Sequence, residues 1–196
     1  MINQGGYIME RRLMQLAEFR HLYDTQMGNH FPADEIKPFY IMEKAVKEGK
    51  YFPYGYYENG SLSAYTCLLK TGDFFLLDYF AVMEQGRGKG TGSQILGIMK
   101  EHLEDRESVL LEVEEPLARE PEVLDLQKRR IQFYLRNDVR YTDLKAQVFG
   151  VPYLILNLGR ELQGEQAKNA MKALYHSILS DEMYEKNVRF ALDKHY

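Results

Sequence analysis

The chain has 196 residues, a formal net charge of −4, 45% hydrophobic residues and 28% charged residues. These values are typical of one globular domain, with or without an extension, that builds its own core. The small acidic excess argues against a general binder of nucleic-acid phosphates, which needs a basic face. It leaves room for a cationic substrate such as an amine.

Three features of the sequence concern the cellular location of the protein. Cys67 is the single cysteine, so no disulfide forms within the chain. The segment Met1–Arg12 lacks the apolar run of a signal peptide. The most apolar stretch, Phe74–Met83, is interrupted by Asp78 and is too short to cross a bilayer. We therefore expect a cytoplasmic protein that does not act on membranes.

The first half of the chain predicts a strand, two helices and a three-stranded meander. A strand is expected around Tyr7–Glu10 and a helix over Leu16–Met27, which stops at Gly28. A second helix begins at Pro38, which is tolerated at a first helical position. The meander consists of three strands joined by Asn59-Gly60 and by a second turn at Gly72: Tyr51–Glu58, Ser61–Lys70 and Phe74–Val82.

The second half predicts a crossover followed by a closing pair of strands. A helix from Gly92 to Leu103 and a strand over Ser108–Glu114 follow the meander directly. A helix over Val123–Leu135 comes next. The remaining expected elements are two strands, Tyr141–Val148 and Pro152–Leu158, a tail helix over Ala167–Ile178, and a short helix or frayed end in the last dozen residues. The order is β-α-α-β-β-β-α-β-α-β-β, an α/β or α+β fold around one mixed sheet.

A glycine-rich loop, Gln85–Gly92, lies between the buried third strand of the meander and the following helix. Its glycines allow several backbone N–H groups to turn toward one point, and the helix start adds positive potential. Arg87 and Lys89 add cationic side chains. A diphosphate fits such a loop. The Walker and Rossmann glycine patterns both fail here, whereas the spacing Arg87-x-x-Gly90-x-Gly92 remains.

The stretch from Ala81 to Leu96 resembles the acetyl-CoA signature of the GNAT acetyltransferases, [QR]-x-x-G-x-[GA], after a strand and opening a helix. The resemblance implies a GNAT-type mixed, mostly antiparallel central sheet flanked by helices over residues 1–160, with a C-terminal helical extension over residues 161–196. The extension is expected to pack on the same domain or on a partner subunit, which leaves room for a homodimer.

The same resemblance implies a binding mode for acetyl-CoA. The backbone N–H groups of the loop would hold the pyrophosphate, and three residues of the preceding strand would pair by main chain with the pantetheine arm. The thioester would lie near Tyr79–Val82 on one side and Glu112 on the other. The residues implied in cofactor binding are Phe80, Ala81, Val82, Arg87, Gly88, Lys89, Gly90, Thr91 and Gly92.

Two residues are candidates for acid–base chemistry. Tyr134 lies in a stretch that resembles the family's F-Y-x-x-x-G-F segment, whose tyrosine protonates the departing thiolate. Glu112 lies in an L-E-V context similar to that of ribosomal-protein N-terminal acetyltransferases of this superfamily, and it would take the proton of the attacking amine. Glu114, Asp78 and water remain alternatives for the base.

The sequence departs from the family at two positions around this segment. Gln127 stands where the family has an asparagine seven residues before the tyrosine, so it is an expected CoA contact with a longer side chain. The family's Gly-Phe pair is replaced by Asp138-Val139. In addition, a long loop over Glu115–Asp125, at the expected mouth of the site, bears on specificity.

The resemblance, together with these residues, implies an N-acetyltransferase that passes the acetyl group of acetyl-CoA to a primary amine of a small molecule, by direct attack in a ternary complex. We expect no metal, because the five histidines are scattered and have no cysteine partner. Two alternatives remain: a non-catalytic acyl-CoA-binding or sensing module, and an acetyltransferase acting on protein N-termini or lysines.

Overall fold

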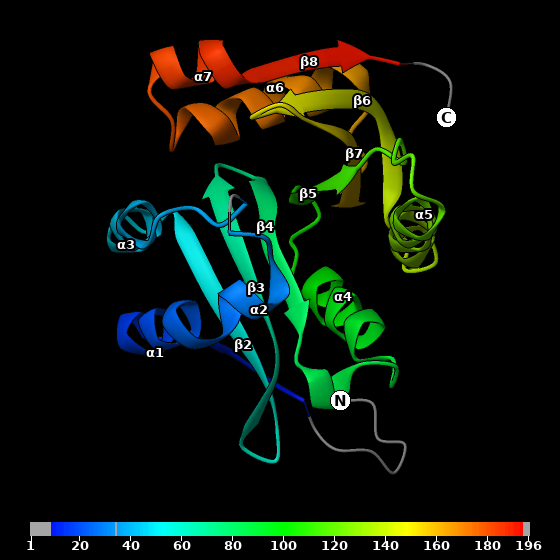
Figure 1. Ribbon diagram of the computed structural model, residues 1–196. Coiled ribbons are helices and arrows are strands. Elements are labelled where there is room, and N and C mark those ends of the chain that lie inside the picture. Colours follow the sequence, from blue (N-terminus) through cyan, green and yellow to red (C-terminus); the bar gives the residue numbers. More distant parts are fainter. Residues whose placement is uncertain (1–8, 34, 194–196) are drawn as a thin grey trace. The chain divides into compact units, whose positions relative to one another are not determined.

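A computed structural model describes residues 9–33 and 35–193 of the chain (Figure 1). Its strands form one eight-stranded sheet in the order β1-β2-β3-β4-β5-β7-β6-β8. Contacts divide the chain into two compact units. The first unit comprises Met1–Leu69 and Asp78–Ile95, and the second comprises Lys70–Leu77 and Leu96–Tyr196. Strand β4 and helix α4 each contribute residues to both units.

The first unit begins with a strand and a long irregular helical segment. Part of the strand expected at Tyr7–Glu10 lies outside the described residues, and β1 spans Glu10–Leu13. The expected helix stop at Gly28 is wrong, because Gly28 keeps a helical φ of −64°. The helical elements are α1 (Leu16–Leu22), a π-helix η1 (Tyr23–Met27), α2 (Gly28–His30) and α3 (Phe39–Lys47).

Aromatic packing joins these helices to the sheet. The ring of Phe19 lies 5.5 Å from that of Phe39 and 6.1 Å from that of Tyr51, measured between centroids. Phe19, Met27 and Met42 are almost completely buried. Since α1, α3 and β2 each contribute one of the three rings, this cluster holds the helices of the first unit on its strands.

The meander follows the prediction closely. Strands β2 (Tyr51–Glu58), β3 (Ser61–Thr71) and β4 (Phe74–Val82) have almost the expected bounds. Asn59 and Gly60 both have positive φ, 51° and 78°, as a tight hairpin turn requires. Strand β1 pairs antiparallel with β2, and β2 pairs antiparallel with β3.

The second unit contains the crossover and the closing strands. The first four residues of β4 pair in parallel with β5 (Ser108–Glu114), from Phe74↔Ser108 to Leu77↔Leu111. Strand β5 then pairs antiparallel with β7 (Val151–Gly159), which pairs with β6 (Arg140–Val148). Helix α4 spans Thr91–Glu101 and α5 spans Pro121–Leu135.

The C-terminal segment adds both helices and a strand. Helix α6 (Gly164–His176) buries a face of small and apolar residues, and α7 (Asp181–Asn187) follows it. The expectation of a helix or a frayed end for the last dozen residues is incomplete, because Val188–Leu192 forms strand β8 and pairs antiparallel with β6. Figure 1 shows α6 lying along β6 and β8. The domain boundary expected at residue 160 remains a prediction.

The predicted fold class is confirmed: the sheet is mixed and mostly antiparallel, it is flanked by helices, and the elements follow the expected order. Within residues 9–33 and 35–193, no helix is long and apolar enough to span a membrane.

Candidate active site

The glycine loop of the first unit connects β4 to α4 through one short 3-10 turn, η2 (Glu84–Gly86). Gly88 and Gly90 have φ of 73° and 81°, which disfavours any residue with a side chain. A Cβ atom at either position would meet nothing within 4 Å. The hydroxyl of Thr91 donates to the carbonyl of Gly86 at 2.9 Å and closes the loop onto the start of α4.

The backbone amides of this loop are the feature that suits an anion. The Arg87 amide donates to the carbonyl of Glu84 at 3.2 Å, so Arg87 is already engaged. From Gly88 to Ser93, no amide donates a hydrogen bond to any residue that the structure describes, and Gln94 makes the first bond of α4, to Gly90. The unpaired N–H groups thus begin one residue later than expected and cover the first turn of a helix, where a phosphate binds readily.

The end of β4 is held from two sides within the same unit. The Arg87 guanidinium donates from Nε to the carbonyl of Val82 at 3.2 Å, and the Met83 amide donates to Ser63 of β3 at 2.9 Å. Ala81 is 9% exposed, whereas Phe80 and Val82 are partly exposed. The pairing of Phe80, Ala81 and Val82 with a pantetheine arm stays a prediction.

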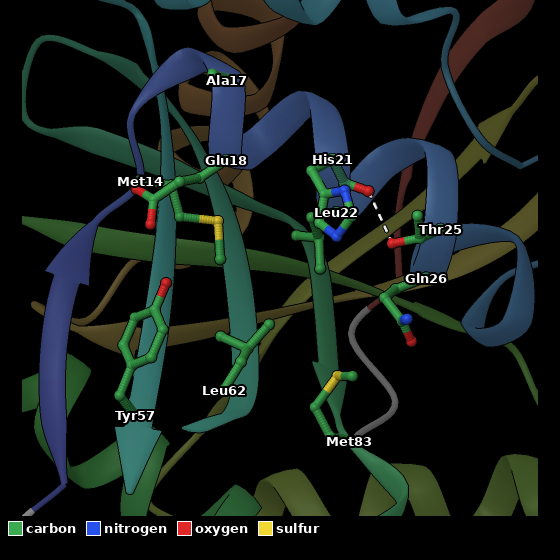
Figure 2. A pocket seen from close by; sticks show the side chains of 10 residues that line it. All are labelled: Met14, Ala17, Glu18, His21, Leu22, Thr25, Gln26, Tyr57, Leu62 and Met83. Carbon is green, nitrogen blue, oxygen red and sulfur yellow. Dashed lines mark hydrogen bonds between the residues drawn. The ribbon is translucent and has the colours of Figure 1, made fainter. Parts of the chain in front are cut away.

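A cavity of about 550 Å³ lies beside this loop, between α1 and η1 and the ends of β2, β3 and β4 (Figure 2). Met14, Leu22 and Leu62 give it an apolar lining, and Met83 directly precedes η2. His21 and Gln26 line its helical side. Their side chains form no hydrogen bond or ion pair with another described residue. The cavity therefore combines apolar walls with two polar groups that a ligand can satisfy.

Asp78, the rival candidate base, is part of a buried ion pair. Its carboxylate, with 5% of the side chain exposed, accepts from Lys37 Nζ at 2.5 Å and from the Tyr51 hydroxyl at 2.6 Å. Burial, and then the charge of Asp78, raise the pKa of Tyr51 well above its ordinary value. The Tyr79 hydroxyl accepts from the Lys37 amide and donates to the Glu35 carbonyl. Asp78 thus anchors the segment before α3 to β4.

Glu112, the preferred candidate base, lies on β5 in the second unit. It is partly exposed and in register with Ile155 of β7. The hydroxyl of Tyr175, on α6, donates to Glu112 Oε1. The sequence reading did not identify Tyr175, which is 63 residues away along the chain.

Glu114 and Gln127 are tied to each other and to the loop that follows β5. Glu114 accepts from Arg130 at 3.1 Å and from Gln127 Nε2 at 3.0 Å. The amide of Ala118 donates to Gln127 Oε1 at 3.2 Å. Both ends of the Gln127 amide are therefore engaged by protein groups, and its contact with CoA remains a prediction. The observed role of Gln127 is to hold the loop over residues 115–120 against α5.

Tyr134, the candidate acid, lies on α5 and is partly buried. Its ring packs edge-on against that of Phe133, with centroids 5.2 Å apart. Its hydroxyl makes no hydrogen bond to another described residue. Burial raises the pKa of Tyr134 to about 12, against a smaller lowering effect of the Arg130 charge, so the phenol is protonated at neutral pH.

The GNAT acetyltransferase family model matches residues 16–120, more than half of the chain, including the glycine loop and β5. The chain belongs to the GNAT acetyltransferase family. As a member, it is an acyltransferase that uses acetyl-CoA. The matched range ends before α5, so the roles of Gln127 and Tyr134 do not follow from it. A search of curated protein sequences finds no match.

Solved structures of acetyltransferases share the fold. A Bacteroides thetaiotaomicron chain assigned to this family is 19% identical, with a TM-score of 0.70, over 86% of this chain and 97% of the other. The ribosomal-protein-S18-alanine N-acetyltransferase from Escherichia coli is 17% identical, with a TM-score of 0.54, over 81% and 97%. A Bacillus subtilis acetyltransferase in complex with CoA is 17% identical, with a TM-score of 0.54, over 79% and 100%. At these identities the likeness concerns the fold alone.

Sequence reasoning missed the partners of the candidate carboxylates in this GNAT protein. Lys37 and Tyr51 lie 41 and 27 residues from Asp78, and nothing in their local sequence marks them. One signal was present for Asp78. A carboxylate in an otherwise apolar strand needs a cation or several donors nearby.

Proposed function

We propose that this protein transfers the acetyl group of acetyl-CoA to a primary amine of a small molecule, by direct attack in a ternary complex. The observation that carries the proposal is the run of amides from Gly88 to Ser93 that donate to no described residue. The run includes two glycines of positive φ and the first turn of α4. In the proposal these amides, which include those of Lys89, Thr91 and Gly92, hold the pyrophosphate of CoA, and the side chains of Arg87 and Lys89 add positive charge.

The state of Cys67 supports direct transfer. Its side chain is fully buried in β3, and burial raises the pKa of its thiol far above the ordinary value. A thiol that neither ionises nor reaches solvent is a poor nucleophile. A covalent acetyl-cysteine intermediate is therefore not part of the proposal, and steady-state kinetics should give intersecting rather than parallel lines.

Glu112 and Tyr134 have complementary roles in the proposed reaction. Glu112 takes a proton from the substrate ammonium, the neutral amine attacks the thioester carbon, and the carbon–sulfur bond breaks. The departing thiolate takes the phenolic proton of Tyr134, which is protonated at neutral pH. The nitrogen loses its second proton as the amide forms, and that proton restores Tyr134 through solvent. Glu112 releases the first proton to solvent, so the products are the amide, the CoA thiol and one proton.

The cavity beside the glycine loop is large enough for a small molecule. Its volume of about 550 Å³ falls in the range of small-molecule sites, roughly 300–1,000 Å³. Replacing Leu62 by Trp would fill part of it. If the acceptor binds there, L62W should raise the KM for the amine at least several-fold and leave the KM for acetyl-CoA unchanged. Equal effects on both constants would place the acceptor elsewhere.

Two measurements test the proposal as a whole. CoA should raise the melting temperature of the protein, as a ligand of the native state does. A panel of small amines should then be screened for release of free CoA thiol. Binding of CoA without turnover of any amine would favour the acyl-CoA-binding alternative. Turnover confined to peptides would favour the alternative in which a protein N-terminus or lysine is acetylated.

A further inference from the structure

We propose that Tyr175, on the C-terminal helix α6, is a positioning residue for the candidate base Glu112. The inference rests on the proposed function, because it needs Glu112 to accept the proton of the amine. It gives the C-terminal segment a part in the reaction, and Tyr175 lies outside the range matched by the family model, which ends at residue 120.

The hydroxyl of Tyr175 is held in place by packing. Tyr175 is 3% exposed, and it belongs to the buried face of α6 together with Ala167, Ala170, Met171 and Leu174, all of which are at most 1% exposed. Its ring lies 6.5 Å from that of Phe190 on β8, between centroids. Since both α6 and β8 pack on β6, the ring has little freedom to move.

The carboxylate that this hydroxyl meets has a rigid backbone. Glu112 is in the middle of the ladder between β5 and β7, which runs from Ser108↔Gly159 to Glu114↔Tyr153. The side chain of glutamate has several rotatable bonds and is costly to immobilise, by about 1–2 kcal/mol. A fixed donor on one oxygen selects one orientation of the carboxylate before the substrate arrives.

The neighbouring carboxylate on the same face of β5 has different partners. Glu114, two residues along the same strand, is paired with the guanidinium of Arg130. Gln127 donates to the other oxygen of the same carboxylate. Of the two carboxylates on this face of β5, Glu114 is thus held by α5, whereas Glu112 receives a hydroxyl from α6.

The chemistry leaves Tyr175 unchanged. The substrate ammonium gives one proton to Glu112, the amine nitrogen bonds to the acetyl carbon, and the carbon–sulfur bond breaks. The leaving thiolate takes the proton of Tyr134, which is restored by the second proton of the nitrogen, and Glu112 releases its proton to solvent. The O–H bond of Tyr175 stays intact throughout, because this phenol donates a hydrogen bond and transfers no proton. Tyr175 therefore acts through Glu112 rather than on the substrate.

The sharpest test is the pH profile of kcat/KM in Tyr175→Phe. Removing a donor to a carboxylate disfavours the charged form, so the acidic limb assigned to Glu112 should move to higher pH by about one unit. The other ionisable groups on and around β5 are retained in this variant. They are Glu114 on β5, Tyr153 on β7, Arg130 on α5 and Lys145 on β6, which pairs with Glu115 and Asp193.

Tyr184→Phe is the matched control. Tyr184 is 7% exposed, lies on α7 of the same segment, and stacks on His176 with centroids 4.0 Å apart. The variant removes a phenolic hydroxyl from the same segment without touching Glu112, so the acidic limb should stay in place. A second comparison uses the Glu112→Gln background, in which Tyr175→Phe should cause no further change in the pH profile.

The outcomes of these experiments separate the positioning role of Tyr175 from the proposed function. An unmoved acidic limb in an active Tyr175→Phe protein, or an equal shift in Tyr184→Phe, overturns the positioning role and leaves the proposed function standing. A wild-type protein that acetylates no amine overturns both. If Tyr175→Phe does not fold, Glu112→Asp withdraws the carboxylate from Tyr175 by one methylene. Full activity of that variant would overturn the role as well.

Discussion

Each compact unit of the molecule places a carboxylate on a strand of the sheet, and the two are held in different ways. In the first unit Asp78 is paired with the ammonium of Lys37 and the hydroxyl of Tyr51. In the second unit Glu112 receives the hydroxyl of Tyr175. The 2.5 Å ion pair makes Asp78 part of the scaffold, whereas in the proposal the Tyr175 hydroxyl orients Glu112 for the substrate.

The two units also hold their candidate groups by different means. The glycine loop of the first unit uses backbone amides of consecutive residues, so its geometry follows from local sequence. The candidate groups of the second unit are side chains oriented by partners far along the chain. Four changes, from the largest expected effect to the smallest, test this contrast.

Glu112→Gln should have the largest effect on catalysis. Loss of the base is expected to lower kcat about 10³-fold, within the usual range for general-base catalysis. Asp78→Asn should lower kcat by less than about tenfold, because its partner is structural. Steady-state assays of amine acetylation compare the two variants. A larger loss of kcat in Asp78→Asn than in Glu112→Gln would indicate that Asp78 is the base and that Glu112 is structural.

Tyr134→Phe should lower kcat about 10²-fold and leave CoA affinity unchanged, since only proton transfer to the thiolate is lost. The variant should also change the pH dependence of stability. The pKa of Tyr134 in the folded protein is raised to about 12. Its contribution to the free energy of unfolding is therefore complete below its ordinary pKa, near 10, and is lost as the pH rises toward 12. Melting temperatures should therefore fall less over this window in the variant. Unchanged turnover would point to another acid.

Lys37→Met should cost about 2 kcal/mol in the free energy of unfolding, because it leaves Asp78 buried with one partner fewer. Because 28% of the Lys37 side chain is exposed, the expected loss of unfolding free energy is smaller than for a fully buried ion pair. Lys100→Met is the control. Its pair with Asp138 is exposed on both sides, so the cost should stay below about 1 kcal/mol. Urea unfolding measures both, and equal costs would contradict a scaffold role for Asp78.

Gly90→Ala should have the smallest effect and act on binding. Its φ of 81° costs a residue with a side chain about 1–2 kcal/mol, so we expect CoA to bind about tenfold more weakly as the loop shifts. Gly97→Ala, in α4 with nothing within 4 Å of the added carbon, should leave CoA binding unchanged. Calorimetric titration with CoA compares them. Equal affinities for CoA in both variants and the wild type would show that the loop is not part of the CoA-binding site.

Features set by neighbouring residues could be predicted from the sequence, whereas features set by residues distant in the chain could not. The meander, the crossover and the loop could be predicted because turn chemistry and periodicity act over a few residues. Asn59-Gly60 and the glycines of positive φ are examples. The helical continuation through Gly28 and the strand β8 were missed, since neighbours in the tertiary structure override weak local preferences there.

The sequence by itself therefore determined the order of the elements up to α6, the glycine loop and the family of this protein. Only the tertiary structure decided what each carboxylate does, by bringing Lys37 to Asp78 and Tyr175 to Glu112. The physical reason is one of range. Backbone conformation depends on adjacent residues, whereas the charge and orientation of a buried carboxylate depend on whichever distant side chains folding places beside it.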